Sequence, residues 1–427
     1  MNPNSVGCSK TELDLFCLPP TQVAIDEGSW IEFTPREKSN NIKFEAKASD
    51  NYIDLSKSWI SFKAQIGGTT AAAKVAGPIN LWGHSLFNQI DMQVNDTILT
   101  SSSAFYGFEA MTTTLLSYGK EATSTQMELG GYVKDTAEHM DVVALDGDNK
   151  GLVTRSKGFN KGEWRDFVMR PCLPLFQQER LLPPETKINL TLKPSDPKFA
   201  LMFDGDNALY KPIMKDFKLH LRAVKVNSTI AVEHAKRRKD NGEKLYYPIR
   251  RLATKAFTLG TGLLSSRETI SKGVLPLRVF VMMVEESAAM GAFKKNPFNF
   301  QHFNLKEIKL TIGGTTSIPS EPLRPDFTNK MAKDCYMNLF SQTGILFDDK
   351  GLDIKYHDFQ NGYSIFAFNL TADQSDGDHL ELVKRNDLDL HLNFGAVLPS
   401  AVTVLSILEY ENCLQIDSND NIIRDYM

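Results

Sequence analysis

Apolar and polar residues alternate along several short segments of this chain. Leucine or isoleucine occupies every second position in KINLTLK (187–193), and the same period recurs in DFKLHLR (216–222) and DLDLHLNF (387–394). Successive side chains of a β-strand point to opposite faces of a sheet, so this alternation predicts strands with one buried and one exposed face. Antiparallel sheets commonly have this arrangement. We therefore expect the chain to be rich in antiparallel β-structure.

Further apolar runs have the length of strands and are bounded by residues typical of turns. Gly-Gly, Asn-Asp, Pro-Pro and Asp-Gly pairs separate the runs, as in β-sandwich folds. These additional strands are expected at 59–66, 90–94, 277–283, 308–312 and 402–408.

Two segments carry the signals of helices. Three serines (101–103) precede the first segment and Gly119 follows it, while Asn329 precedes the second and Gly344 follows it. Serine and asparagine favour the start of a helix, and glycine favours its end. Each helix is expected directly after a strand and a turn.

The same order of elements occurs twice: strand, tight turn, helix, long polar segment and two alternating strands. The first set comprises 89–94, the helix at Phe105, and segments 120–163, 188–192 and 217–223. The second set comprises 305–312, the helix at Met331, and segments 347–362, 388–394 and 402–408. This order predicts two copies of one β-sandwich plan.

The length of 427 residues exceeds what one hydrophobic core usually supports, so we expect two domains. The polar, basic run HAKRRKDNGEK ends at Lys244 and interrupts the strand pattern. We therefore expect an N-terminal arm at 1–24, a first sandwich at 25–227, a basic linker at 228–244 and a second sandwich at 245–427.

Composition limits the partners and the compartment. The formal net charge of −4 and the isoelectric point of about 6.1 argue against sequence-specific binding of nucleic acid. The sequence contains no apolar run long enough for a membrane span and no secretion signal. An odd, scattered set of cysteines favours a reducing compartment: Cys8, Cys17, Cys172, Cys335 and Cys413.

Catalytic and cofactor motifs are absent from the sequence, so we expect no enzyme, no catalytic residue, no metal ligand and no cofactor. The eight histidines are not spaced as metal ligands. Acidic loops at 146–151, 204–207 and 373–378 have carboxylates spaced as in calcium sites, but aspartate, glycine and asparagine also form ordinary turns. We interpret these three loops as turns.

A cluster of four basic residues, KRRK at 236–239, leaves three interpretations open. The cluster is read as a solvated linker, as a nuclear-import signal, or as a small patch facing packaged nucleic acid.

Several segments together resemble the major capsid proteins of Polinton (Maverick) elements and adintoviruses. These proteins belong to the double jelly-roll lineage that includes adenovirus hexon. The resemblance lies in ELDLFCLPPTQVAIDEGSWIEFTPR (12–36), NYIDLSKSWISFKAQI (51–66), GPINLWGHSLFNQIDMQVNDTILT (77–100) and LLSYGKEA (115–122). It covers about the first third of the chain, and the second half resembles the family mainly through its plan.

The resemblance implies an all-β fold of two consecutive eight-stranded jelly rolls with a few short helices in loops. It implies a homotrimer of pseudo-hexagonal outline, which contacts neighbouring trimers in an icosahedral shell around double-stranded DNA. It also implies a single jelly-roll penton protein and minor capsid proteins as partners. The expected location is the virion, after synthesis in the host cytoplasm, with nuclear assembly left open.

Two other functions remain as alternatives: a minor capsid or vertex protein of the same kind of virus, and a non-viral β-sandwich that binds carbohydrate. One further expectation concerns the polar segments 120–163 and 313–362. Their turns at 146–151 and 348–351 are expected to be exposed at one end of the molecule, because buried loops leave backbone polar groups without partners.

Overall fold

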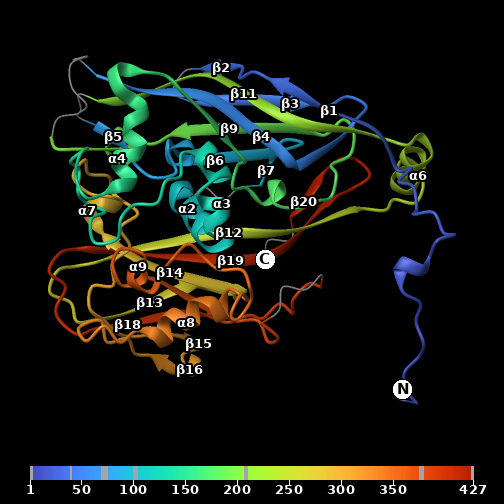
Figure 1. Cartoon of the computed structure of the whole chain (residues 1–427). Coiled ribbons are helices and arrows are strands. Elements are labelled where there is room, and N and C mark those ends of the chain that lie inside the picture. The colour runs from blue at the N-terminus through green and yellow to red at the C-terminus, as the bar shows by residue number, and fades with distance from the viewer. Residues whose placement is uncertain are drawn as a thin grey trace.

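The computed structural model describes residues 3–38, 41–68, 76–99, 104–205, 210–374 and 379–424. Two stacked bodies of antiparallel strands make up most of the molecule, one from each half of the chain (Figure 1). The N-terminal residues lead away from these bodies as an extended arm.

The first half forms two sheets that face each other. One has the strand order β1 (Ile25–Phe33), β11 (Lys211–Val226), β4 (Tyr52–Gly67), β8 (Arg165–Met169). The other has the order β2 (Glu37–Lys38), β3 (Ile42–Lys47), β9 (Lys187–Pro194), β6 (Phe87–Val94), β7 (Thr97–Ile98). A small separate pair consists of β5 (Ala76–Pro78) and β10 (Leu201–Phe203).

The second half repeats this arrangement. Its first sheet has the order β12 (Leu245–Leu259), β19 (Val402–Ile416), β14 (Arg278–Glu285), β17 (Ile365–Asn369), with β20 (Ile422–Arg424) beside β19. Its second sheet has the order β13 (Ser265–Ser271), β18 (Leu388–Phe394), β15 (Leu305–Ile312), β16 (Thr316–Leu323).

The two halves share one topology. When β2, β5, β10 and β20 are set aside and the remaining strands of each half are numbered in chain order, both halves have one sheet of order 1-8-3-6 and one of order 2-7-4-5. Every pairing is antiparallel, and this order of eight strands is that of a jelly roll. The prediction of two consecutive eight-stranded jelly rolls, and of one plan used twice, is confirmed.

Nine α-helices lie in the described part of the chain, most of them in connections. They are α1 (Trp82–Ser85), α2 (Tyr106–Ser117), α3 (Lys120–Thr123), α4 (Lys150–Ser156), α5 (Pro197–Ala200), α6 (Ser228–Lys239), α7 (Glu286–Ala289), α8 (Lys333–Gln342) and α9 (Tyr356–Gln360). Short 3-10 turns are η1 (Thr11–Leu13), η2 (Gln126–Gly130), η3 (Lys157–Gly162) and η4 (Pro174–Phe176). Within the described ranges, no helix is long and apolar enough to cross a membrane.

The two expected helices are α2 and α8, and each lies between strands five and six of its jelly roll. The serines expected to start the first helix lie outside the described residues. Helix α8 begins at Lys333, later than expected, because the Asn329 side chain donates to Asp326 Oδ2 at 2.7 Å and belongs to a preceding turn. Gly344 follows α8 with φ +78°, as a helix-ending glycine does.

The alternating leucines form the core of each jelly roll. Leu190 and Leu390 are both at most 1% exposed, and Leu190 lies between Phe44 of β3 and Met92 of β6. Buried side chains of the two halves belong to one continuous apolar cluster, so the jelly rolls are joined by packing as well as by the chain.

The segment expected as a basic linker is helical over most of its length. Helix α6 begins after Asn227, whose side chain accepts a hydrogen bond from Thr229 N. The four basic residues 236–239 lie in its last turn, where positive charge is favoured by the helix dipole. Arg237 also pairs with Glu243, and Arg238 with Asp420 at 2.6 Å. The prediction of a linker missed this helix because it considered only strand periodicity. The Asn227 cap and the basic last turn, which favour a helix, do not appear in that pattern.

The expectation of an exposed turn at 146–151 is only partly right. Asp146 and Asp148 are exposed, but Asn149 and Gly151 are buried. Asn149 caps α4 by accepting from Leu152 N, and its amide donates to Met140 O at 3.2 Å. The turn therefore folds back onto the protein. Residues 347–350 of the second polar segment are exposed, as expected.

We predict that a short Gly/Ser-flanked tag is tolerated after Asp349 but not after Asp148. Asp349 and its neighbours are exposed, whereas an insertion after Asp148 separates Asn149 from Thr136 N and Met140 O, which precede it in the chain. Loss of these two hydrogen bonds costs about 2 kcal/mol. Urea unfolding of the two insertion variants measures the difference. Equal stability of the two would show that the Asn149 contacts do not hold this turn.

Candidate functional site

The junction between the two jelly rolls is an apolar layer built from aromatic rings. Phe108 of α2 and Phe199 both pack edge-on against Phe298 of the second half, with ring centroids 5.7 and 6.0 Å apart. Phe203 packs on Phe293 at 4.3 Å and donates its backbone N–H to the Phe293 carbonyl at 2.9 Å. Buried aromatic pairs of this kind stabilise an interface through area and ring geometry.

A buried ion pair lies within the same junction. Arg155 Nη2 is 2.7 Å from Asp135 Oδ1, and both side chains are at most 3% exposed. Asn296 Nδ2 donates to the other Asp135 oxygen at 3.1 Å, and the Tyr363 hydroxyl donates to the Asp135 carbonyl at 2.9 Å. Since Asn296 and Tyr363 belong to the second half, this pair connects the two jelly rolls.

Further polar contacts surround the ion pair. Lys134 Nζ is 2.6 Å from Asp358 Oδ2, and Asp141 accepts from Asn296 N at 2.7 Å and from Asn299 Nδ2 at 2.9 Å. The junction is therefore fixed at several independent points and holds the jelly rolls in one relative orientation. Sequence reasoning missed these residues because they lie in polar segments and their partners in the other jelly roll are more than 150 positions away.

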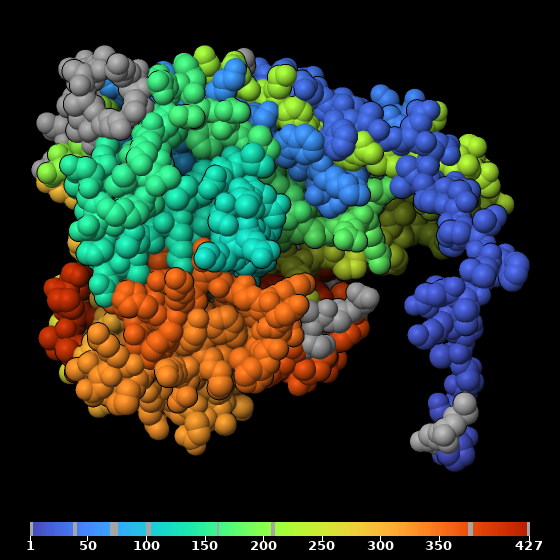
Figure 2. Space-filling model, in the orientation of Figure 1, coloured from blue at the N-terminus to red at the C-terminus, as the bar shows by residue number. Residues whose placement is uncertain are grey.

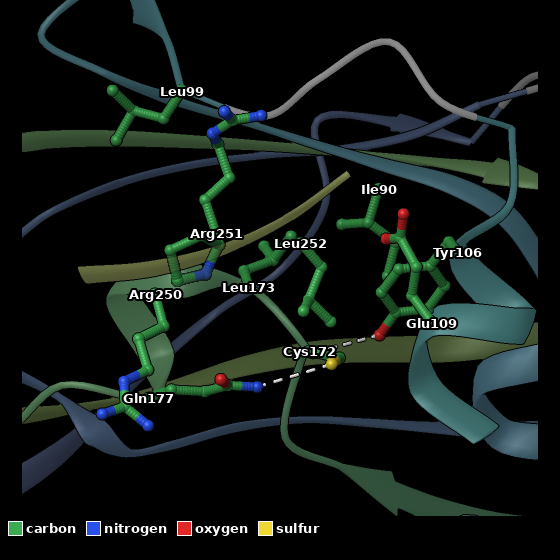
Figure 3. Close-up of a pocket in the computed structure, with 11 residues that line it drawn as sticks. Ile90, Leu99, Tyr106, Glu109, Cys172, Leu173, Gln177, Arg250, Arg251 and Leu252 are labelled. Atoms are coloured by element: carbon green, nitrogen blue, oxygen red, sulfur yellow. Dashed lines mark hydrogen bonds between the residues drawn. The ribbon is translucent and has the colours of Figure 1, made fainter. Parts of the chain in front are cut away.

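A small cavity of about 40 Å³ lies between α2, η4 and β12 (Figure 3). Glu109 of α2 lines it and accepts a hydrogen bond from Thr254 Oγ1 of β12 at 2.7 Å. Burial raises the pKa of Glu109 to about 7, although the hydrogen bond from Thr254 and the charge of Arg251 both lower it. A cavity of this size holds a few water molecules and no organic substrate.

We predict that Glu109→Gln removes a pH dependence of stability. The folded chain retains the Glu109 proton up to about pH 7, whereas the ordinary pKa is 4.5, so the free energy of unfolding decreases as the pH rises between these values. The glutamine keeps an oxygen that accepts from Thr254 but does not titrate, so the stability of the variant should not decrease over this pH range. Urea unfolding should show equal stability below pH 4.5, and at pH 8 a variant more stable by at most about 3 kcal/mol. A difference that does not change with pH would contradict the assignment.

The other titratable groups beside this cavity are not arranged for catalysis. Burial raises the pKa of Cys172 to about 11 and lowers the pKa of His84 to about 4. The Tyr106 hydroxyl lies between them, 2.8 Å from His84 Nδ1 and 3.2 Å from the Cys172 backbone nitrogen that donates to it. A thiol with a raised pKa is protonated at neutral pH and is a poor nucleophile.

The acidic loops carry carboxylates spaced as in calcium sites. Among the described residues, one group has the proximity of metal ligands, namely Asp373, His379 and Glu381, whose ligand atoms lie within 4.8 Å of one another. His379 pairs with both carboxylates, at 3.3 and 3.4 Å, and Asp373 and His379 are exposed. Parts of the loops 204–207 and 373–378 lie outside the described residues.

An aromatic and basic cluster occupies the outer face of the first sheet. Trp30 of β1 and Trp59 of β4 have ring centroids 5.6 Å apart, and Arg222 lies 4.3 Å from the Trp30 ring. His220 stacks on Trp59 at 5.3 Å. Trp30 is 51% exposed. Tryptophan and arginine are enriched at protein interfaces, so this face is a candidate contact surface.

Comparison with known proteins assigns the fold to a class. The structure is similar to that of the Sputnik virophage, with a TM-score of 0.65 and 13% identity over 99% of this chain and 93% of that chain. It is also similar to the PBCV-1 virus capsid, with a TM-score of 0.59 and 9% identity over 96% of this chain and 99% of that chain. For the mavirus major capsid protein the TM-score is 0.55, with 11% identity over 99% of this chain and 95% of that chain. The chain has the double jelly-roll fold of viral major capsid proteins.

One curated protein, an uncharacterized protein of Caenorhabditis elegans, is 23% identical over 96% of this chain and 99% of its own length. No family model matches the chain. The similarity to capsid proteins rests on the fold of nearly the whole chain.

Proposed function

We propose that this chain is a viral major capsid protein, a structural protein and not an enzyme. Its homotrimers would form pseudo-hexagonal capsomers that tile an icosahedral shell around double-stranded DNA. The observation that carries the proposal is the pair of jelly rolls with identical strand order, fixed side by side by a buried junction. Two such units in each of three chains give six similar modules around a threefold axis, which suits a hexagonal lattice.

The proposed units are a first jelly roll at 25–227 and a second at 245–427, joined by 228–244 and preceded by an arm at 1–24. The sheets support these bounds, because each described sheet draws its strands from one half alone. A single jelly-roll vertex protein would need only one such unit, so the fold favours the major capsid protein over the vertex alternative.

Within this class we propose the Polinton (Maverick) or adintovirus type. The resemblance of residues 12–36, 51–66, 77–100 and 115–122 supports this assignment. A penton-type protein, minor capsid proteins and neighbouring trimers are the proposed partners, and the virion is the proposed location.

We predict that the purified protein is a homotrimer. Three chains of 47.9 kDa give a mass of about 144 kDa. In a trimer, contacts between the chains would cover part of the exposed apolar surface, such as the face around Trp30. Light scattering coupled to size-exclusion chromatography measures the mass at micromolar concentration. A stable mass near 48 kDa would contradict the trimer.

A further inference from the structure

The N-terminal arm, residues 3–24, is exposed along its whole described length. Figure 2 shows it standing clear of the rest of the surface. The arm is attached to the body at its end, where Asn227 N donates to the Ala24 carbonyl at 2.9 Å. Its large apolar side chains are between 69% and 96% exposed: Val6, Leu13, Leu15, Phe16, Leu18 and Val23. Apolar side chains gathered in this way mark a binding segment.

The centre of the arm leaves its apolar residues uncovered. After η1 the chain is extended, and Pro19 and Pro20 prevent it from continuing as a helix. Leu15 and Phe16 are 77% and 96% exposed, and residues 14–20 form no helix or strand that would cover them. The arm therefore buries these apolar residues only against another surface.

A groove of matching character lies on the first jelly roll. It has a volume of about 550 Å³, within the range of roughly 300–1,000 Å³ typical of binding sites. It runs along β8, the edge strand of its sheet, between α2 and η2. Its apolar wall includes Trp59, Leu81, Met127, Leu129 and Val168. Leu129 is 57% exposed and thus open to a partner.

The charges of the two surfaces are complementary. Arg170 is the one Lys, Arg, Asp or Glu that lines the groove, and no carboxylate among the described residues pairs with it. His84 also lines the groove, but its low pKa keeps it neutral. The arm carries Glu12 and Asp14 beside its apolar residues. Lys10 also lies in the arm, so the part from Thr11 onward is the acidic part, and its charge is complementary to the basic rim of the groove.

The arm leaves the body beside α6, at the opposite side of the view from α4 and α7, and it extends away from α2, which forms one wall of the groove (Figure 1). The 12 residues from Leu13 to Ala24 span at most about 40 Å, enough to reach a neighbouring molecule. Each copy carries one arm and one groove, so a contact between them is head-to-tail, and it closes as a ring of three where the rotation between neighbouring copies is 120°.

We propose that the arm of one copy docks through Leu13, Leu15, Phe16 and Leu18 into the groove lined by Trp59 and Leu129 on a second copy. The inference deepens the proposed function, on which it rests, by naming the segment and the surface through which copies of the tile recognise each other.

A disulfide between copies tests the docking. Cys17 lies in the arm, and Leu129→Cys places a thiol in the groove. Cys8→Ser leaves Cys17 as the single arm thiol, and Cys172→Ser removes the native thiol that lines the groove; both changes are present in every sample. After mild oxidation, non-reducing electrophoresis should show covalent dimers at twice 47.9 kDa, about 96 kDa, and larger species. A docked arm presents Cys17 at roughly millimolar effective concentration, so the yield should exceed that of the controls by at least about tenfold.

Three controls make the experiment decisive. In the first control, Val232→Cys replaces Leu129→Cys and places a comparably exposed thiol on α6. In the second, Cys17→Ser removes the arm thiol. In the third, Phe16→Ser with Leu18→Ser weakens the apolar contact of the arm and leaves the rest of the chain unchanged. All three should lose the crosslink. An equal yield with Val232→Cys, a disulfide within one chain, or no disulfide would overturn the docking. Light scattering of the same samples separates the two proposals: trimers without the crosslink refute only the docking, whereas monomers refute the trimeric tile.

Discussion

Leu190→Asp is expected to unfold the first jelly roll, and Leu390→Asp the second. Both leucines are at most 1% exposed and lie in the middle of central strands β9 and β18. Each substitution removes a packed side chain and buries a carboxylate without a partner, which together cost more than about 5 kcal/mol. Since a native domain is stable by only about 5–15 kcal/mol, little folded protein should remain.

Soluble yield and thermal unfolding followed by circular dichroism measure these effects. Thr191→Asp and Asn393→Asp are the matched controls, because they introduce the same charge on the opposite face of the same strands. The controls should unfold within about 0.5 kcal/mol of the original protein. A core variant that is as stable as its control would show that the register of that strand is wrong.

Arg155→Leu is expected to cause the second largest loss. It leaves the Asp135 carboxylate buried with only Asn296 as a side-chain partner, and breaking a buried ion pair in this way costs about 3–5 kcal/mol. Arg36→Leu is the control, because Arg36 pairs with Glu45 on the surface, where such pairs contribute about 0–1 kcal/mol. Urea unfolding of both variants gives the comparison.

A double variant shows whether the charge itself is responsible. Asp135→Asn in the Arg155→Leu background removes the unpaired charge and keeps an oxygen that accepts from Asn296, so it should regain part of the lost stability. If Arg155→Leu alone were no more harmful than Arg36→Leu, the ion pair would not be the element that holds the junction.

The strands that two-residue alternation predicted are those with one buried and one exposed face. The apolar runs at 277–283 and 402–408 predicted β14 and the first part of β19, where almost all residues are buried. In β18 the burial alternates along Leu388–Phe394 as the leucines do. The β13 segment, SSRETIS, is largely polar, and β12 is mostly half-buried on both faces, so neither shows a strong contrast between faces. In β17 all five residues are buried and no alternation exists. Two-residue periodicity detects a strand only when its two faces differ.

The junction could not be predicted for a different reason. Asp135, Arg155 and Asn296 become a network only when the two jelly rolls are placed side by side, and nothing local distinguishes them from exposed polar residues. The helix α6 was missed because its side chains are largely exposed, so no apolar periodicity marks it. The cap at Asn227 and the charged last turn stabilise it instead. The repeated jelly-roll plan could be predicted from the sequence because it depends on the order of elements along the chain.

Electron microscopy of the purified protein tests the capsid proposal most directly. The account predicts particles of threefold symmetry and hexagonal outline, with six similar lobes that correspond to two jelly rolls from each of three chains. Single two-lobed particles, or assemblies without a threefold axis, would contradict it.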